Sequence, residues 1–160
     1  MLSDTHIRPG TRRRLPDVVY TELEQADVIL HAGDVVVSEV LDELAGFAPV
    51  HAVLGNNDHE LVGRLPVIDQ VLIEGVCIGL IHDSGPRTGR DGRMSRRFPG
   101  AAVVVYGHSH IPDDHEGVGG QVLFNPGSPT DRRAQPHHSF GILEVAAGEL
   151  VAHRIVAIPS

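Results

Sequence analysis

The chain has 160 residues, of which 41% are hydrophobic and 21% charged, and its formal net charge is −8. These values favour a single globular domain spanning residues 1–160 over a disordered or fibrous chain. An acidic chain offers no basic face for phosphate backbones, which argues against general nucleic-acid binding; all 13 basic residues are arginine, which excludes a lysine nucleophile.

The single cysteine, Cys77, excludes an intramolecular disulfide and is typical of a reducing compartment. It lies within an apolar run, where we expect a small buried residue. No apolar stretch approaches the roughly 18 residues of a membrane span. We therefore expect a cytoplasmic location and no membrane partner.

The first half of the chain alternates short apolar runs with helical patterns. Residues 16–25 predict a helix, because a proline near the start is followed by apolar residues on one face. A buried strand is expected at 28–31. Ser38 is the expected N-cap of a second helix that stops at Gly46, and residues 50–54 form the next strand. This order favours a parallel βαβ unit.

The second half is richer in strands. Residues 71–74 and 76–81 predict a hairpin, and residues 90–98 predict a short basic helix. The whole pattern predicts an α/β fold of two packed β-sheets flanked by helices, in the layer order α-β-β-α. Further strands are expected at 101–106, 121–124, 139–145 and 150–156, the last two joined by a turn at Ala147 and Gly148.

Only three residues precede Asp4, although a strand in a sheet usually has about five. The first strand is therefore either a stub or the end of a strand whose reading frame begins upstream. We expect the second, because a missing central strand would leave the backbone groups of its neighbours without partners.

Short polar clusters follow the apolar runs, at strand ends whose loops can bring distant side chains together. Seven of their side chains are the candidate donors, namely two carboxylates, one amide oxygen and four imidazoles. Nitrogen and oxygen donors without thiolates favour Mn, Fe, Zn, Ni or Co over Ca or Mg. In chain order the clusters are Asp4-Thr5-His6, Gly33-Asp34, Gly55-Asn56-Asn57-Asp58, Ile81-His82-Asp83 and Gly107-His108-Ser109-His110.

Each cluster alone is weak evidence for a metal site. A buried histidine is often only a hydrogen-bonded core residue, and an aspartate at a strand end is often a turn former. Turn formation, however, gives no reason for four imidazoles at these positions. In an extended segment, Asp4 and His6 would point the same way, as would His108 and His110, so that each pair could reach one ion.

The ordered series D-x-H, G-D, G-N-x-D, H and G-H-x-H resembles that of the calcineurin-like metallophosphoesterases. The short length and the hairpin in the second half resemble their small YfcE-like phosphodiesterase branch, and Asn125-Pro126-Gly127-Ser128 is similar to the N-P-G-S segment of that branch. The resemblance runs from Asp4 to Ser128 and implies the four-layer metallophosphoesterase fold.

The resemblance also implies a binuclear centre of two divalent transition-metal ions, with manganese as the first expectation. Asp34 would bridge the ions, and a water or hydroxide between them would attack a small phosphoester substrate. One ion would be held by Asp4, His6, Asp34 and His110, and the other by Asp34, Asn56, His82 and His108.

Asn57 departs from the family pattern. Many members have at this position a histidine that hydrogen-bonds the substrate phosphate or protonates the leaving group. Asparagine can donate a hydrogen bond but no proton, which favours esters with good leaving groups, such as aryl esters. His59 is a second candidate for the acid, and we expect Asp58 to orient Asn56 or a ligand histidine.

The residues after His82 also depart from the pattern. Asp83 and Ser84 replace the usual glycine and histidine and change the rim of the pocket. The basic stretch that follows is either an exposed helix face or an attractor of phosphorylated substrates, and Arg12-Arg13-Arg14 is either a solvated helix start or a phosphate clamp. We interpret His31 as a packed, hydrogen-bonded strand residue. The basic stretch consists of Arg87, Arg90, Arg93, Arg96 and Arg97.

Three hypotheses about function follow. The first is a binuclear metal-dependent phosphodiesterase. The second is a protein-binding scaffold on the same fold, as in a eukaryotic retromer subunit with a degraded site. The intact ligand set argues against this hypothesis, whereas the missing acid at Asn57 is consistent with it. The third is a phosphomonoesterase or nucleotide hydrolase, because the pocket walls set substrate choice. The physiological substrate, the native metal and the oligomeric state, a homo-oligomer included, stay open.

Overall fold

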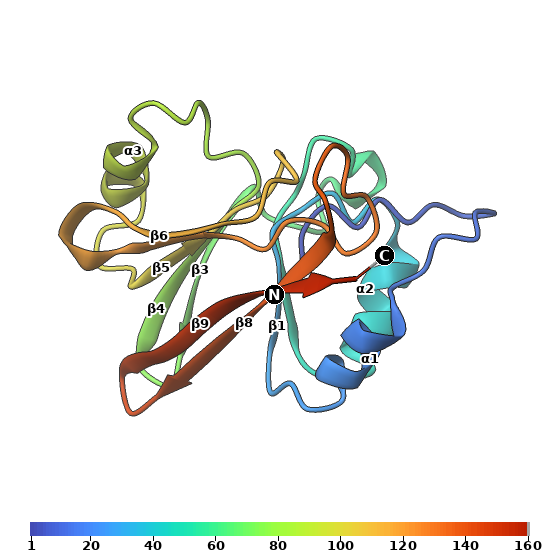
Figure 1. Ribbon diagram of the computed structural model, residues 1–160, viewed down its shortest axis with the longest axis horizontal. Coiled ribbons are helices and arrows are strands. Elements are labelled where there is room, and N and C mark those ends of the chain that lie inside the picture. Colours follow the sequence, from blue (N-terminus) through green and yellow to red (C-terminus); the bar gives the residue numbers. More distant parts are fainter. Residues whose placement is uncertain (160) are drawn as a thin grey trace.

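The computed structural model describes residues 1–159 and has two β-sheets, with helices α1 and α2 beside one sheet and α3 beside the other (Figure 1). This is the α/β sandwich that the alternation of strands and helices predicts. Among the residues that the structure describes, no helix combines the length and hydropathy needed to cross a bilayer.

The first half forms the expected βαβ unit. The unit consists of β1 (Ile29–His31), α2 (Ser38–Ala45) and β2 (Val50–Ala52), and β1 and β2 are parallel. The helix α1 (Asp17–Leu23) precedes it. Apolar residues of both helices pack against β1 in one buried cluster. The prediction that Ser38 caps α2 is wrong, because Ser38 is already helical and Val37 occupies the cap position without a side-chain hydrogen bond.

The second sheet has the strand order β3-β4-β5-β7-β6, and its predicted hairpin is confirmed. Strand β6 was not predicted, because its sequence DDHE is wholly polar and lies at the edge of the sheet. The helix α3 (Arg90–Arg97) covers the outer face through Met94. The strands are β3 (Ile68–Ile73), β4 (Val76–Ile81), β5 (Val103–Val105), β6 (Asp113–Glu116) and β7 (Val122–Asn125), with short 3-10 turns at η1 (His59–Leu61) and η2 (Val118–Gly120).

The long antiparallel pair β8 (His138–Ala146) and β9 (Glu149–Ile158) joins the first sheet through the start of the chain. The N–H of Leu2 donates to the carbonyl of Leu30 (2.9 Å), and the N–H of Gly141 donates to the carbonyl of Met1 (3.0 Å). Met1 and Leu2 therefore form a very short strand between β1 and β8.

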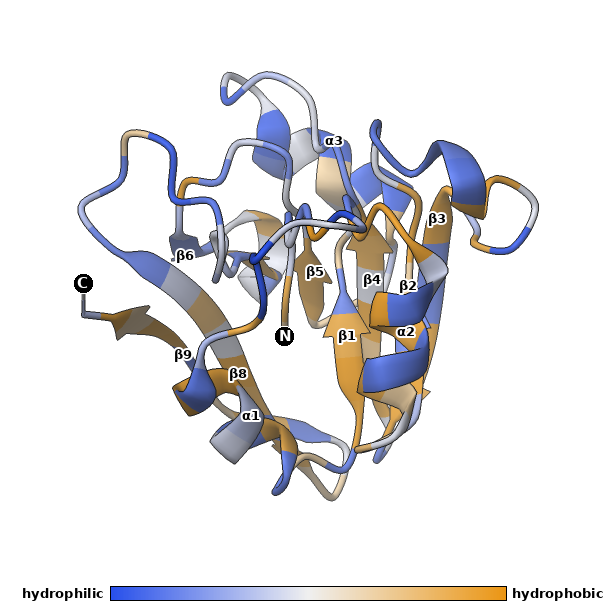
Figure 2. Cartoon of the chain, turned by 90° about the vertical axis from the view of Figure 1, so that its right-hand side faces the viewer, coloured by the Kyte–Doolittle hydropathy of each residue, from blue (hydrophilic) through white to orange (hydrophobic). Residues whose placement is uncertain are grey.

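Apolar side chains fill the space between the sheets, from Leu30 of β1 to Ile78 of β4 and Phe124 of β7. Figure 2 shows this distribution, with the hydrophobic colour on strands such as β1, β4 and β5 and the hydrophilic colour on many of the loops beyond their ends. Because β1, β4 and β5 end at one edge of the sandwich, the loops that follow them converge there.

Candidate metal centre

Asp4 is the most deeply buried of the predicted donors, with none of its surface exposed. Its Oδ2 accepts hydrogen bonds from the Ser3 hydroxyl (2.6 Å) and from the N–H of His108 (3.0 Å). Its Oδ1 is buried without a hydrogen-bond partner and lies 3.3 Å from Nε2 of His110 and 3.8 Å from Nε2 of His6. A carboxylate oxygen in this setting is costly unless a cation or proton meets it, so it fits a metal ligand.

Asp34 lies between the histidines of the two predicted sites. Its Oδ2 is 3.4 Å from Nε2 of His6 and 3.5 Å from Nε2 of His82. Ligand atoms of Asp4, His6 and His110 all lie within 4.8 Å of one another, and so do those of Asp4, Asp34 and His82. The two groups share Asp4 and are neighbours, and the Asp34 carboxylate faces one histidine of each predicted ion site.

Asn56 and His108 complete the cluster on the side of His82. The amide oxygen of Asn56 is 3.0 Å from Nε2 of His82 and 3.0 Å from Nδ1 of His108. The structure thus brings all seven predicted donors into one continuous group of contacts, from His108 at one end to His110 at the other.

The hydrogen bonds of two histidines fix which ring nitrogen is free. The Nδ1–H of His82 donates to the carbonyl of Ala32 (2.7 Å), and the Nδ1–H of His110 donates to the carbonyl of Asp131. In both rings Nε2 is then the nitrogen that faces the carboxylates. This arrangement is typical of metal-ligating histidines, whose other nitrogen is held by a carbonyl or carboxylate.

Most of these donors sit on a left-handed backbone. The φ angles are 53° at Asp4, 45° at His6, 58° at Asp34, 68° at His108 and 59° at His110. The two D-x-H and H-x-H segments are therefore not extended, and their side chains converge because each donor turns the chain. Each such residue costs on the order of 1–3 kcal/mol, a strain that clusters at functional sites.

The sequence matches the model of the calcineurin-like phosphoesterase superfamily domain over residues 1–148. The chain belongs to this superfamily. It is 37% identical over 134 residues to a probable metallophosphoesterase of Methanothermobacter thermautotrophicus, an alignment that covers 81% of this chain and 76% of that protein.

Solved structures share the fold over almost the whole chain. Wild-type Vps29 of Entamoeba histolytica complexed with zinc has a TM-score of 0.77 and 25% identity, covering 98% of this chain and 96% of that one. A structure described as a novel archaeal phosphodiesterase has a TM-score of 0.73 and 23% identity, covering 98% and 97%. The second likeness concerns the fold alone.

Within this calcineurin-like site, two glycines allow the loops to approach one another. A Cβ on Gly55 would lie 2.1 Å from Oδ1 of Asp34, and one on Gly107 would lie 1.9 Å from Oγ of Ser3. Both distances are far below van der Waals contact. The first residue of the G-N and G-H motifs must therefore be glycine because a larger side chain would clash with the neighbouring loop, and not only because the chain turns there.

The charge state of Asp34 suits a cation. Burial alone would raise the pKa of this carboxyl, but hydrogen bonds from His82 and Asn57 outweigh it and hold the pKa well below its usual range. Asp34 is thus an anion at neutral pH.

The buried His31 lies nearby. Burial lowers its pKa to about 3, and its ring accepts a hydrogen bond from the N–H of Gly33 (3.2 Å) and contacts the Thr5 hydroxyl (3.2 Å). The interpretation of His31 as a packed strand residue is confirmed.

Asn57 and Asp58 lie beside Asp34, with contacts that differ from those expected. The side-chain amide of Asn57 donates to Asp34 (2.7 Å), so it does not point freely toward a substrate. Asp58 accepts from the backbone N–H groups of Asp34 (2.9 Å), Val36 (2.6 Å) and Gly55 (2.7 Å). It thereby orients the loops that carry the donors, not Asn56 or a ligand histidine. His59 begins η1 on the exposed surface.

Two side chains of the N-P-G-S segment hydrogen-bond the loops that carry Asp4 and the G-H-x-H motif. The amide of Asn125 donates to the carbonyl of Gly107 (3.1 Å) and to the Ser109 hydroxyl (3.1 Å), which fixes the G-H-x-H loop. The hydroxyl of Ser128 donates to the carbonyl of Asp4 (2.7 Å).

Two arginines border the site. Nη1 of Arg13 lies 3.4 Å from the carbonyl of His6 and 3.5 Å from the carboxylate of Asp131. Nη1 of Arg133 lies 3.5 Å from the carbonyl of His108. Sequence reasoning singled out the triplet that contains Arg13 but missed Arg133, which no motif marks.

Proposed function

We propose that this chain is a metal-dependent phosphodiesterase with a binuclear centre of divalent transition-metal ions, manganese first among them. The observation that carries the proposal is a buried, unpaired oxygen of Asp4 in a residue shared by two groups of candidate ligands, one with His6 and His110 and the other with Asp34 and His82. Membership of the calcineurin-like phosphoesterase superfamily supports the reaction class. One ion would be held by Asp4, His6, Asp34 and His110, and the other by Asp34, Asn56, His82 and His108.

When bound, two such ions supply Lewis acidity at the phosphoryl oxygens and activate a water molecule for in-line attack. The residues of the chain position this chemistry. Asp34 presents a permanent anion between the two histidine groups, and Asn57 holds its orientation. Arg13 and Arg133 offer positive charge at the border, where the phosphate of a substrate would approach.

A preference for diesters with good leaving groups follows from Asn57. Its amide cannot deliver a proton, and it is already engaged by Asp34. His59 lies on the exposed surface at the start of η1, and no hydrogen bond or ion pair joins it to the candidate donors among the described residues. An aryl leaving group departs as an anion without a proton donor, so aryl diesters are the expected model substrates.

The test is hydrolysis of bis-p-nitrophenyl phosphate with Mn²⁺, alongside p-nitrophenyl phosphate as the monoester. Asp34→Asn should lower the rate at least about 1,000-fold and release bound manganese in elemental analysis. Asp42→Asn, on the exposed surface of α2, is the matched control and should change neither. Full activity of Asp34→Asn would contradict the proposal, and faster turnover of the monoester would favour a phosphomonoesterase.

A protein-binding scaffold on the same fold is the second candidate. The likeness to Vps29 over 98% of this chain supports it. The intact donor set weighs against it. Binding of Mn²⁺ without hydrolysis of any ester in the panel would favour the scaffold.

A further inference from the structure

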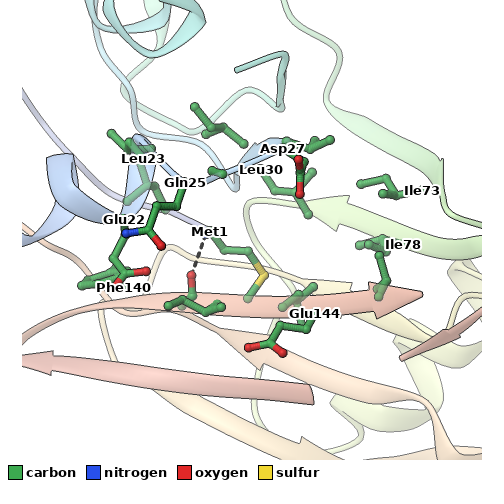
Figure 3. A pocket seen from close by; sticks show the side chains of 18 of the residues that line it. Met1, Glu22, Leu23, Gln25, Asp27, Leu30, Ile73, Ile78, Phe140 and Glu144 are labelled. Atoms are coloured by element: carbon green, nitrogen blue, oxygen red, sulfur yellow. Dashed lines mark hydrogen bonds between the residues drawn. The ribbon is translucent and has the colours of Figure 1, made fainter. Parts of the chain in front are cut away.

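A cavity of about 770 Å³ beside Met1 is not lined by any of the seven candidate donors (Figure 3). The α-amino group of Met1 donates to the carbonyl of Gly141 (2.6 Å) in the wall of this cavity. The contacts that hold the donors in place therefore lie elsewhere, around the loop Asp4-Thr5-His6.

This loop has a backbone that its own sequence does not explain. Asp4 and His6 have left-handed φ angles of 53° and 45°. Such angles persist in residues other than glycine only where the surroundings hold them. One support is the loop after β1, because the N–H of Asp4 donates to the carbonyl of Gly33 (2.9 Å) and the N–H of His6 donates to the carbonyl of Asp34 (3.0 Å). The buried carbonyl groups of the loop need partners of their own.

Segment 128–131 supplies these partners from across the fold. The Ser128 hydroxyl donates to the carbonyl of Asp4 (2.7 Å), and the Thr130 hydroxyl donates to the carbonyl of Thr5. The Ser128 oxygen also accepts from the N–H groups of Thr130 (3.3 Å) and of residue 131 (2.9 Å), which folds the segment on itself. Ser128 is buried, as are both residues whose carbonyls accept, so these contacts are shielded from water.

The same segment also fixes the ring of His110. The Nδ1–H of His110 donates to the carbonyl of Asp131, and its Nε2 lies 3.3 Å from Oδ1 of Asp4. The carboxylate of Asp131 lies 3.5 Å from Nη1 of Arg13, which in turn lies 3.4 Å from the carbonyl of His6. Segment 128–131 therefore supports, directly or through Arg13, three of the four residues proposed to hold the first ion.

The donors proposed for the second ion alone have other supports. The Nδ1–H of His82 donates to the carbonyl of Ala32 (2.7 Å), and the amide oxygen of Asn56 contacts both His82 and His108 (3.0 Å each). Within residues 1–159, no hydrogen bond or ion pair joins segment 128–131 to any of these three donors.

We propose that Ser128 and Thr130 are positioning residues for the first ion only, so that the two ion sites can be weakened separately. The inference rests on the proposed function, because it concerns the two ions of that centre. Without the two hydroxyls, the carbonyls of Asp4 and Thr5 lose their partners, and the left-handed turns lose one of their two supports. The ligand atoms of the loop are then no longer held within 4.8 Å of that of His110.

The experiment titrates the metal-free protein with Mn²⁺ and follows free Mn²⁺ by electron paramagnetic resonance, which counts bound ions without reference to activity. Thr130→Val removes the hydroxyl and keeps the shape of the side chain. It should weaken one of the two bound ions about 10- to 100-fold and leave the other within about twofold. Thr130→Ser restores the hydroxyl and should bind both ions as the wild type does. Ser128→Ala should have the same selective effect, but its loss of three hydrogen bonds makes Thr130→Val the decisive variant where Ser128→Ala does not fold.

Two backgrounds assign the weakened site. His82→Ala keeps the donors of the first ion, so adding Thr130→Val should weaken the remaining ion by the same factor. His110→Ala keeps the donors of the second ion, so adding Thr130→Val should leave the remaining ion unchanged.

Ser139→Ala separates positioning from general stability. Its buried hydroxyl donates to the carbonyl of Pro126 (2.8 Å) and contacts no donor. This variant should lower Tm and leave both Mn²⁺ affinities unchanged.

Equal weakening of both ions by Thr130→Val, no change in either, or the same loss in Ser139→Ala would overturn this inference and leave the phosphoesterase proposal standing. Failure of the wild type to bind two Mn²⁺ ions would overturn both.

Discussion

Asn57 donates hydrogen bonds to both carboxylate oxygens of Asp34, from its backbone N–H to Oδ1 (2.8 Å) and from its side-chain amide to Oδ2 (2.7 Å). Asp34 in turn faces His6 and His82. The residue that departs most clearly from the family pattern is thus tied to the carboxylate that would bridge the ions. We propose that Asn57 positions the Asp34 carboxylate for metal binding.

Asn57→Ala should weaken Mn²⁺ binding about 10- to 100-fold, because loss of an outer hydrogen bond leaves the Asp34 carboxylate free to rotate. Calorimetric titration of the metal-free protein with Mn²⁺ measures this without reference to activity. His59→Ala, two residues further along and exposed, is the matched control and should bind as the wild type does. Unchanged affinity of Asn57→Ala would refute the positioning role.

Asp58 should matter for stability more than any exposed acid. Its carboxylate is 1% exposed and accepts three backbone N–H groups, which would be left unpaired in Asp58→Ala. We expect a loss of about 3 kcal/mol, equivalent to a Tm lower by about 6–12 °C for a chain of this size. Asp58→Asn keeps one acceptor oxygen, so its Tm should lie between the Tm values of the wild type and Asp58→Ala.

The control for Asp58 is Asp42→Ala, whose carboxylate makes only a surface ion pair with Arg64 (2.8 Å). Such a pair contributes roughly 0–1 kcal/mol, so Tm should move by no more than about 3 °C. A similar Tm for Asp58→Ala and Asp42→Ala would show that the three backbone contacts of Asp58 are not important for folding.

Residue type and order were sufficient to predict which side chains the fold brings together, but the geometry that unites them could not be predicted. Neither turn formation nor core packing selects imidazoles and carboxylates in a fixed order, so the order of the motifs carried the prediction of a metal site. The left-handed φ angles of Asp4 and His108 depend on contacts with distant loops. The i, i+2 argument for an extended chain therefore joined Asp4 and His6 for the wrong local reason, and it was wrong for His108 and His110, which contact opposite ends of the cluster.

The same distinction holds for the fold. Apolar runs such as β4 and β5 are strands by composition alone, because Val and Ile favour a buried sheet. The polar strand β6 exists only because the edge of β7 offers hydrogen bonds to it. The contacts of Asp58 and Arg133 are likewise made across the fold, and no local pattern in the sequence marks them.

His31 should make the stability of the metal-free protein fall in mild acid. Burial lowers its pKa to about 3 in the folded state, whereas the unfolded value is 6.5. Below about pH 6.5, His31 therefore binds a proton in the unfolded chain but not in the folded chain. His31 alone should lower the free energy of unfolding by about 2 kcal/mol between pH 7 and pH 5, and this contribution should grow toward pH 3.

Urea unfolding at pH 7 and pH 5 in EDTA measures this loss. His31→Gln should be less stable at pH 7 but should lose about 2 kcal/mol less on acidification, since glutamine does not titrate. His51→Gln, on β2 with a side chain that is 41% exposed, should keep the wild-type dependence. The buried α-amino group of Met1, whose pKa burial lowers to about 5, also destabilises the folded state in acid. Its contribution is the same in all three proteins, so it cancels when their losses of stability are compared. Parallel pH profiles for His31→Gln and wild type would exclude this role for His31.

Arg133 should act on substrate capture rather than on the chemical step. Its Nη1 lies beside the carbonyl of His108 at the border of the donor cluster, in an exposed position. Arg133→Gln removes one positive charge from the path of an anionic ester. We expect KM for bis-p-nitrophenyl phosphate to rise roughly three- to tenfold with kcat nearly unchanged, and the difference to shrink at 1 M salt, where screening acts within about 3 Å.

The control is Arg64→Gln, which removes the same charge from a surface pair with Asp42 and should leave KM unchanged. If both variants raised KM equally, the effect would reflect net charge and not position. If Arg133→Gln lowered kcat with KM unchanged, Arg133 would contact the reacting phosphate in the transition state instead of attracting the substrate. A rise in KM for Arg133→Gln, but not for Arg64→Gln, would support the interpretation that Arg133 attracts the substrate phosphate at the border of the site.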